Sequence, residues 1–226
     1  HDAHVHPPMG GRYLLLCDLH DLAWDRDTYL RRIREYAEAH RAEAWIVGGG
    51  WAMPAFPGGT PSRADLDAVV PDRPAWFENR DGHGGWANSA ALALAGVTAA
   101  TPDPPDGRIE REPDGSPQGT LHEGATRLVE RLLPPFSQAR WEEALRRAQA
   151  YLHGFGITDA WVTPEHLPAY LALVERGELT LRTSLSLWWD RAGGLDQLAW
   201  FAETRRSASS GRLRATTVKL MLDGVL

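Results

Sequence analysis

Two histidines separated by one valine, His4 and His6, lie in the opening segment HDAHVHP. Residues 2–6 alternate between polar and apolar side chains, which is typical of a β-strand. Both imidazoles then project from one face of the strand, with Cα atoms ~6.6 Å apart. This spacing suits two ligands of one metal ion, at zinc–nitrogen distances near ~2.0–2.1 Å. Asp2 shares the face and is predicted to orient a ligand imidazole. An exposed loop is the alternative.

The elements that must position these histidines follow a repeating order in the second half of the chain. Predicted helices alternate with predicted strands there, and this alternation indicates βαβ units and a parallel sheet. Four strands of this type are expected, at residues 2–6, 157–162, 181–188 and 214–222. A (β/α)8 barrel needs eight strands. The expected fold class is therefore α/β: the first half of a TIM-like barrel, with an α/β domain inserted after its first strand.

This reading divides the chain into three parts. The first barrel strand and the histidine motif occupy residues 1–11, the inserted α/β module residues 12–135, and the later barrel units residues 136–226. A second strand is expected at residues 12–19, where the inserted module begins. Because the motif has no strand before it and the last strand has no helix after it, we expect the sequence to be part of a longer protein.

Composition excludes several classes of partner. Of the 226 residues, 43% are hydrophobic and 24% are charged, so a packed core is expected. The formal charge is -6 and basic residues are scattered, which argues against nucleic acid or an anionic membrane as the partner. No window approaches the ~18 apolar residues of a membrane span. Cys17 is the only cysteine, which fits a reducing compartment, so a cytoplasmic location is predicted.

A lysine near the end of the chain is a second candidate for the site. In the segment TTVKLMLDG, alternation places Thr217, Lys219, Met221 and Asp223 on one face. A parallel barrel strand is buried on both faces, and an unpaired buried ammonium is costly. A neutral amine avoids this cost and is nucleophilic, so it could capture carbon dioxide as a carbamate, whose two oxygens can bridge metal ions. A half-exposed strand with the lysine in water is the alternative.

The inserted module contains a glycine-rich segment, RDGHGGWANS, that is predicted to form a loop facing the substrate. His83 would be its polar contact and Trp86 its apolar wall, and Trp51 after the GGG segment is assigned in the same way. A tight turn with a buried tryptophan anchor is the alternative. Trp188 and Trp189 follow a barrel strand on the side where a pocket opens, so one of them is predicted to line an apolar substrate site.

Several longer segments carry a family resemblance. HDAHVHP resembles the first-strand signature of the amidohydrolase superfamily. The resemblance narrows to the amidohydrolase-3 group, which includes YtcJ-like and N-substituted formamide deformylase-like proteins. It rests on the segments GGGW, FPGGTPSRADLDAVVPDRPAWFENRDGHGGWANSAALALAG, DPPDGRIEREPDGSPQGTLHE and VKLMLDG.

This resemblance implies a metal-dependent hydrolase with one or two divalent metal ions, zinc being the expected metal. His4 and His6 would be ligands, and Lys219 would be a carboxylated lysine bridging the ions. The resemblance places two further histidines and an aspartate, the general base, on later strands that would lie beyond Leu226. The chain as written is therefore expected to be inactive alone.

The expected reaction is hydrolysis of an amide or related C–N bond, of formamide or N-acyl type, by a metal-activated hydroxide. Two alternatives stay open. The same site could deaminate a heterocycle or open a lactam, or the chain could be a binding module with an incomplete metal site. The expected partner is a small-molecule amide, and a homodimer also stays open.

Overall fold

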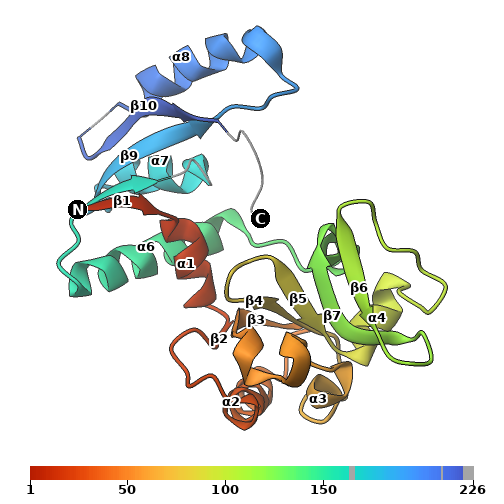
Figure 1. Cartoon of the computed structure of the whole chain (residues 1–226). Helices are drawn as coiled ribbons and strands as arrows, with labels where there is room; N and C mark the ends of the chain where they lie inside the picture. The colour runs from red at the N-terminus through yellow and green to blue at the C-terminus, as the bar shows by residue number, and fades with distance from the viewer. Residues whose placement is uncertain (163–165, 210, 221–226) are drawn as a thin grey trace. The chain divides into compact units, whose positions relative to one another are not determined.

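The computed structural model describes residues 1–162, 166–209 and 211–220. The chain divides into two units, each of which is compact (Figure 1). Unit 1 comprises His1–Leu15 and Phe136–Leu226, and unit 2 comprises Leu16–Pro135. Among the described residues, no helix combines the length and the apolar composition that a membrane crossing requires.

Unit 1 contains a four-stranded parallel sheet with the order β1-β8-β9-β10. Its strands are β1 (Asp2–Val5), β8 (Asp159–Val162), β9 (Arg182–Trp188) and β10 (Leu213–Lys219). Its helices are α1 (Pro7–Tyr13), α6 (Gln138–Gly154), α7 (Leu167–Glu175) and α8 (Leu198–Ser207), with a 3-10 turn η4 (Gly194–Gln197) before α8. The prediction of four strands in one parallel sheet is confirmed, although residues 221 and 222 of the last predicted strand lie outside the described residues.

One face of this sheet packs on helices. Side chains from the strands and from α6, α7 and α8 form a single buried cluster, which includes Val162, Leu185 and Leu213 from the sheet. Helix α6 begins where the side chain of Ser137 accepts a hydrogen bond from the Arg140 amide. The residues on the other face are mostly exposed or half-buried, and this face is called the open face below.

The prediction of a strand at residues 12–19 is wrong. Instead, α1 continues to Tyr13, and the strand β2 (Cys17–Asp18) contains only two residues. Pro7 and Pro8 occupy the first turn of α1, where a missing amide hydrogen costs nothing. The helix then packs on α6 so closely that a Cβ at Gly11 would lie 1.8 Å from the carbonyl oxygen of Ala144. This tertiary contact, rather than local propensity, stabilises a helix in a segment rich in glycine and proline.

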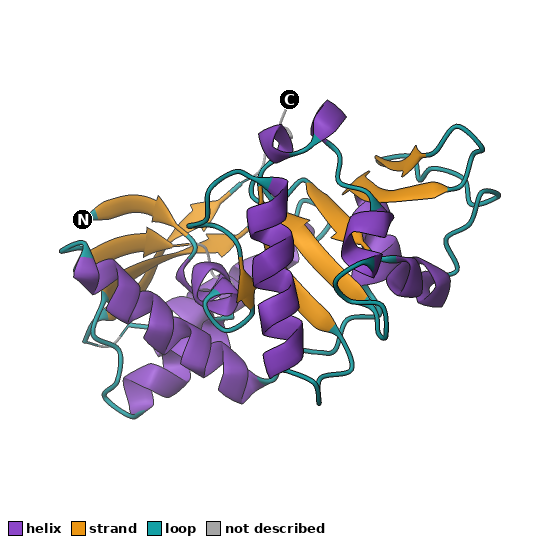
Figure 2. Cartoon of the chain, turned by 90° about the horizontal axis from the view of Figure 1, so that it is seen from below, coloured by secondary structure: helices purple, strands orange, loops and turns teal. Residues whose placement is uncertain are grey.

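Unit 2 contains a six-stranded mixed sheet with the order β2-β3-β4-β5-β7-β6. Strands β2, β3 and β4 are parallel, and β5, β7 and β6 join them through antiparallel pairs. Its further strands are β3 (Ile46–Trp51), β4 (Ala75–Asn79), β5 (Gly84–Ala87), β6 (Gly107–Arg111) and β7 (Pro117–Glu123). Its helices are α2 (Arg26–Ala39), α3 (Arg63–Asp67), α4 (Ser89–Ala95) and α5 (Arg127–Glu130), with 3-10 turns η1 (Met53–Ala55), η2 (Pro57–Gly59) and η3 (Gly124–Thr126). Figure 2 shows the strands and the helices packed alongside them.

Local signals explain where the helices of unit 2 begin and end. The Asp25 side chain accepts a hydrogen bond from the Thr28 amide at the start of α2, and Asn88 does the same for the Ala91 amide at the start of α4. Helix α4 ends at Gly96, which adopts φ 68°. Asn88 is therefore the N-cap residue of α4.

The glycine-rich segment before α4 forms a strand rather than the predicted loop. Residues Gly84–Ala87 make β5, which is buried between β4 and β7. The glycines permit this close packing, because a Cβ at Gly85 would lie 1.9 Å from the ring of Trp76. The segment therefore positions His83 at the beginning of a strand.

Candidate metal centre

The two histidines of the opening motif lie side by side on the open face of unit 1. Val5 pairs with Val162 and packs against the buried cluster, so His4 and His6 project from the opposite face. Their ring centroids are 5.1 Å apart and their planes are inclined by 78°. Two imidazoles that bind one tetrahedral ion through nitrogens ~2.1 Å from it have centroids about 5 Å apart. The separation of the two rings therefore matches that of two ligands of a single metal ion.

Asp2 does not lie on the face of the histidines, contrary to what simple alternation predicts. It pairs with Ala160 of β8, a residue of the buried cluster, and β1 has one extra residue between this pair and the pair of Val5 with Val162. Its carboxylate accepts a hydrogen bond of 2.9 Å from the backbone amide of His4. In this structure Asp2 supports the backbone of the motif.

A bulge in β10 determines the face that Lys219 occupies. Ala215 pairs with Leu185, but the next pair joins Thr217 to Ser186, so β10 contains one extra residue. Beyond the bulge Thr217 and Lys219 share the face of Ser186, opposite to the face of Ala215. Lys219 is thereby placed on the open face, as the histidines are, whereas unbroken alternation would group it with the buried Leu213 and Ala215. Met221 and Asp223, which were grouped with it, lie outside the described residues.

The lysine contacts a tryptophan at the carboxyl end of the sheet. Its Nζ lies 5.4 Å from the ring centroid of Trp188, which is its partner in the ladder. Trp188 is 44% exposed on the open face. Trp189 faces the other way: it packs against the buried cluster, with its ring centroid 5.7 Å from that of Phe201. The two tryptophans predicted as pocket residues therefore serve different faces.

Hydrogen bonds join three further residues of the open face, of which only Thr217 was grouped with Lys219 from the sequence. The Trp161 indole N–H donates to the hydroxyl of Thr217 at 3.2 Å, and the hydroxyls of Thr217 and Ser186 are 2.9 Å apart. Serine and threonine are common in strands, so nothing in the sequence marks them; only the register of β9 and β10 brings them together.

The described residues contain no group of three or more histidine, cysteine, aspartate or glutamate side chains that could hold a metal ion. His4 lies on β1 and His6 directly follows it, whereas Lys219 lies on β10, at the opposite edge of the four-stranded sheet. Three strand spacings separate them, about 14 Å along a flat sheet. The structure brings the two histidines together and places the lysine on the same face.

Two tryptophans that were predicted to face a substrate are core residues of unit 2. Trp51 and Trp86 have no exposed surface. The Trp51 indole donates to the carbonyl of Phe77 and the Trp86 indole to that of Ser62, each at 2.8 Å. Their rings pack around Phe56 in the buried cluster. In this structure neither ring offers a surface to a ligand, because both are already enclosed.

His83 lies at the start of β5 and is 38% exposed. Its Nδ1 is 3.1 Å and 3.3 Å from the two carboxylate oxygens of Glu123, at the end of β7. Glu123 was not recognised from the sequence. Its backbone adopts φ 49°, ψ -128°, which is unusual for a residue with a side chain, and no sequence signal marks such a position.

Comparison with known proteins identifies the family. The model of a family described as "Amidohydrolase family" matches residues 1–226. The chain belongs to this family. Among curated relatives, the Bacillus subtilis protein YtcJ is 34% identical over 163 residues, 71% of this chain and 29% of the relative. The N-substituted formamide deformylase of Arthrobacter pascens is 35% identical over 117 residues, 49% of this chain and 22% of the relative.

Other relatives extend the comparison. The Arabidopsis thaliana protein LONG AFTER FAR-RED 3 is 35% identical over 157 residues, 70% of this chain and 27% of the relative. An uncharacterized metal-dependent hydrolase from Pyrococcus furiosus, known from its crystal structure, superposes with a TM-score of 0.63 at 22% identity. That alignment covers 99% of this chain and 44% of the other, and it shows a shared α/β fold. This amidohydrolase chain spans between 22% and 44% of the length of the curated relatives it matches.

Proposed function

We propose that this amidohydrolase is a metal-dependent hydrolase of an amide or related C–N bond, and that its metal centre forms on the open face of unit 1. The observation that carries the proposal is the bulge in β10. It places Lys219 on the face that also presents His4 and His6. All three residues lie at or near the carboxyl ends of parallel strands, which is where α/β barrels present their catalytic groups.

We further propose that the four-stranded sheet is the first half of a TIM-like barrel and that unit 2 is inserted after its first strand. The parallel order β1-β8-β9-β10, with helices between the last three strands, supports this arrangement. In a closed barrel the open face would become the interior. Curvature of the sheet would then shorten the path between the histidines and the lysine on the opposite edge strand.

Zinc is the metal we propose, because imidazole nitrogens are among its usual ligands and the His4–His6 pair has the spacing that one tetrahedral ion requires. A bound zinc ion would polarise the scissile carbonyl and lower the pKa of a water molecule to ~7. The further ligands and the aspartate general base are those that the family resemblance places beyond Leu226. The residues of unit 1 would supply one side of this centre.

Each residue on the open face has a part in this proposal. His4 and His6 hold the ion, and Asp2 fixes the backbone of His4. The neutral amine of Lys219 would add carbon dioxide and lose a proton, and the carbamate so formed would offer its oxygens as further metal ligands. The ring of Trp188 lies next to the Lys219 Nζ and would give the site an apolar wall. We propose formamide or N-acyl substrates, because the Arthrobacter pascens relative is named for N-substituted formamides.

The test is hydrolysis with and without metal. A longer protein that carries this chain together with the further ligands and the general base is freed of metal with a chelator and reloaded with zinc. It is then assayed for release of amine from an N-substituted formamide and an N-acetyl amine. We expect activity that follows zinc content. The proposal fails if the protein, with all its ligand residues intact, binds no divalent metal, or if hydrolysis persists unchanged after the metal has been removed.

A further inference from the structure

A second polar region lies in unit 2, at the end of its sheet where β4 and β7 finish and β5 begins. This end of the sheet is called its edge below. Strands β2, β3 and β4 are parallel, and β7 runs in the same direction because both β4 and β7 are antiparallel to β5. The ends of β4 and β7 and the start of β5 therefore share one edge, which presents Arg80, His83 and Glu123. In open α/β sheets, ligands bind outside the carboxyl ends of the parallel strands.

His83 is held by Glu123 through both its imidazole and its backbone. The Glu123 carboxylate accepts a hydrogen bond from Nδ1, and the Glu123 amide donates to the His83 carbonyl at 2.9 Å. A carboxylate at Nδ1 favours the tautomer that carries its proton there, so the lone pair of the neutral ring lies on Nε2. His83 is thereby prepared to accept a hydrogen bond through Nε2.

Glu123 occupies a backbone conformation that glycine would adopt without strain. With φ 49° and ψ -128°, it lies outside the regions open to residues with a Cβ. Neighbouring hydrogen bonds hold it there, from the Glu123 amide to His83 and from the Gly124 amide to the Asp106 carbonyl. Strained residues of this kind are concentrated at functional sites. A side chain kept where glycine fits better indicates that the carboxylate itself is needed.

We propose that His83 is a binding residue for an N–H group of a small amide or amine, and that Glu123 is the positioning residue that fixes its tautomer. The surroundings favour such a donor, because the carboxylates of Glu123 and Asp81 both lie beside His83 and disfavour an anion. The nearby cation, Arg80, donates instead to the backbone carbonyl of His20. The ligand class rests on the proposed function, since amide substrates and their amine products carry N–H groups. The site itself rests on unit 2 alone.

The experiment uses nitrogen NMR of the histidine side chains in this chain at pH 8.5, about two units above the ordinary histidine pKa. The probes are N-methylacetamide, which has one N–H, and N,N-dimethylacetamide, which has none. We expect His83 as the Nδ1–H tautomer, with an Nε2 resonance that N-methylacetamide shifts saturably and at least about tenfold more strongly than the dimethyl probe. His122, whose Nε2 is bonded to Glu110 at 3.0 Å, serves as the internal control.

Two variants separate positioning from structure. Glu123→Ala and Glu123→Gly both remove the carboxylate, but only alanine keeps a Cβ at the strained position. We expect both variants to lose the tautomer preference and the response to N-methylacetamide, while the glycine variant melts at or above the temperature of the parent chain and clearly above the alanine variant. A purely structural role for Glu123 predicts instead that the glycine variant melts well below the parent.

The inference is overturned if His83 is the Nε2–H tautomer or if the two probes shift it equally. Neither readout depends on metal or turnover. If hydrolysis fails but His83 still responds to N-methylacetamide, only the proposed function is contradicted. If the protein is active but His83 does not respond to N-methylacetamide, only this inference is contradicted.

Discussion

Thr217 lies opposite Ser186 across the ladder of β9 and β10, with 2.9 Å between their hydroxyl oxygens. The preceding pair, Ala215 with Leu185, is two residues earlier on β10 but only one residue earlier on β9. The extra residue reverses the alternation of side chains in the rest of β10, so Lys219 lies on the open face and not on the helix-covered face. A single bulge thus decides whether the lysine can take part in the proposed metal centre.

Substitution of Lys219 by arginine tests what that position does. Arginine keeps the positive charge and the stacking over Trp188, but its guanidinium cannot form a carbamate. In a longer protein that also carries the further ligands, we expect the melting temperature to stay within a few degrees while kcat/KM for a formamide falls at least about 100-fold, the size of one lost metal-site contribution. Zinc content measured alongside is expected to fall.

The matched control for this prediction is Lys219→Met, which removes the charge and keeps the apolar stem. If the lysine serves only as a stacked surface cation, Lys219→Arg keeps full activity and only the methionine variant changes. Equal activity of the arginine variant and the parent would therefore contradict a carbamate at this position.

Replacement of either histidine of the motif is expected to weaken zinc binding. Loss of a residue that merely supports a metal ligand costs 10–100-fold in affinity, so loss of a ligand in His4→Asn or His6→Asn is expected to cost at least about 100-fold. The measurement is competition for zinc with a colorimetric chelator. His1→Asn is the control, because His1 bonds Asp159 and is exposed in the same segment. Equal zinc affinity in all three variants would contradict the proposal that His4 and His6 are metal ligands.

Much of the sheet in unit 1 could be predicted from the sequence, because its strands alternate with helices of clear apolar periodicity. Helix α1 could not, since proline and glycine in PPMGGRY disfavour a helix locally and the contact of Gly11 with Ala144 is visible only in three dimensions. Strand β5 was missed for a similar reason: its Gly85 is required by the ring of Trp76.

The candidate site was predictable only in part. The spacing of His4 and His6 is enough to place both rings on one face, because one valine separates them on a strand. The face that Lys219 occupies depends on the bulge after Ala215, and no residue near it is of a type that predicts a bulge. The contact of His83 with Glu123 joins residues 40 positions apart and exists only because β5 pairs with β7.

Cys17 is expected to be chemically inert in the folded protein. It is fully buried, and burial raises the pKa of its thiol to about 12 from the ordinary 9.0. At pH 8 the thiolate is then about a thousandfold scarcer than for an exposed cysteine, and the thiolate is the reactive form. We expect no measurable reaction with a disulfide reagent in minutes, and one thiol per chain after denaturation.

The control for the thiol prediction is an exposed cysteine in the same protein. Ala139→Cys in a Cys17→Ser background places a thiol on the exposed first turn of α6. This variant is expected to react completely within minutes under native conditions. Comparable rates for Cys17 and the engineered thiol would show that β2 opens readily.

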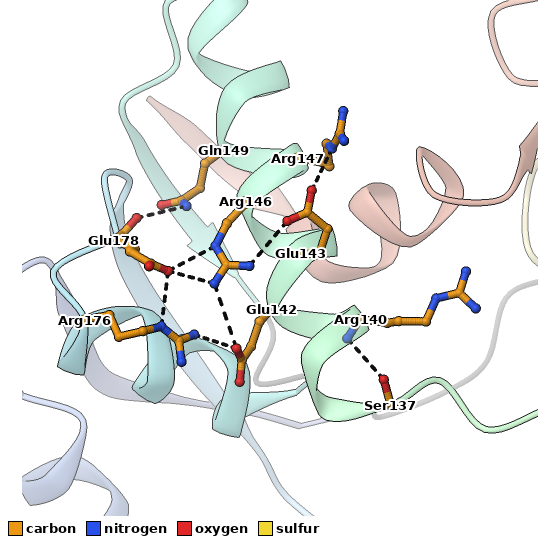
Figure 3. Close-up of polar contacts among 9 residues, drawn as sticks. All are labelled: Ser137, Arg140, Glu142, Glu143, Arg146, Arg147, Gln149, Arg176 and Glu178. Atoms are coloured by element: carbon orange, nitrogen blue, oxygen red, sulfur yellow. Dashed lines mark hydrogen bonds and ion pairs between the residues drawn. The ribbon is translucent and has the colours of Figure 1, made fainter.

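An ion-pair network connects α6 with the segment that follows α7 (Figure 3). The guanidinium of Arg146 donates to one oxygen of Glu178 at 2.8 Å and 3.0 Å, and Arg176 reaches the same oxygen at 3.3 Å. Arg176 also bonds Glu142, one turn before Arg146 on α6. The hydrogen bond from Arg146 is the main cause that lowers the pKa of Glu178, and hydrogen bonds from Gln138 and Arg176 lower that of Glu142.

The network predicts a loss of stability in acid. A carboxyl group whose pKa is lower in the folded than in the unfolded state stabilises the fold above its unfolded pKa, and this contribution disappears as the pH falls through the folded value. We therefore expect the melting temperature to fall between pH 5 and pH 3, and to fall less steeply in Glu178→Gln, which has already lost the contribution. Glu203→Gln, which breaks a single exposed pair with Arg206 on α8, is the control and should keep the parent's slope. The same slope in all three proteins would show that the network contributes nothing, as many exposed ion pairs do.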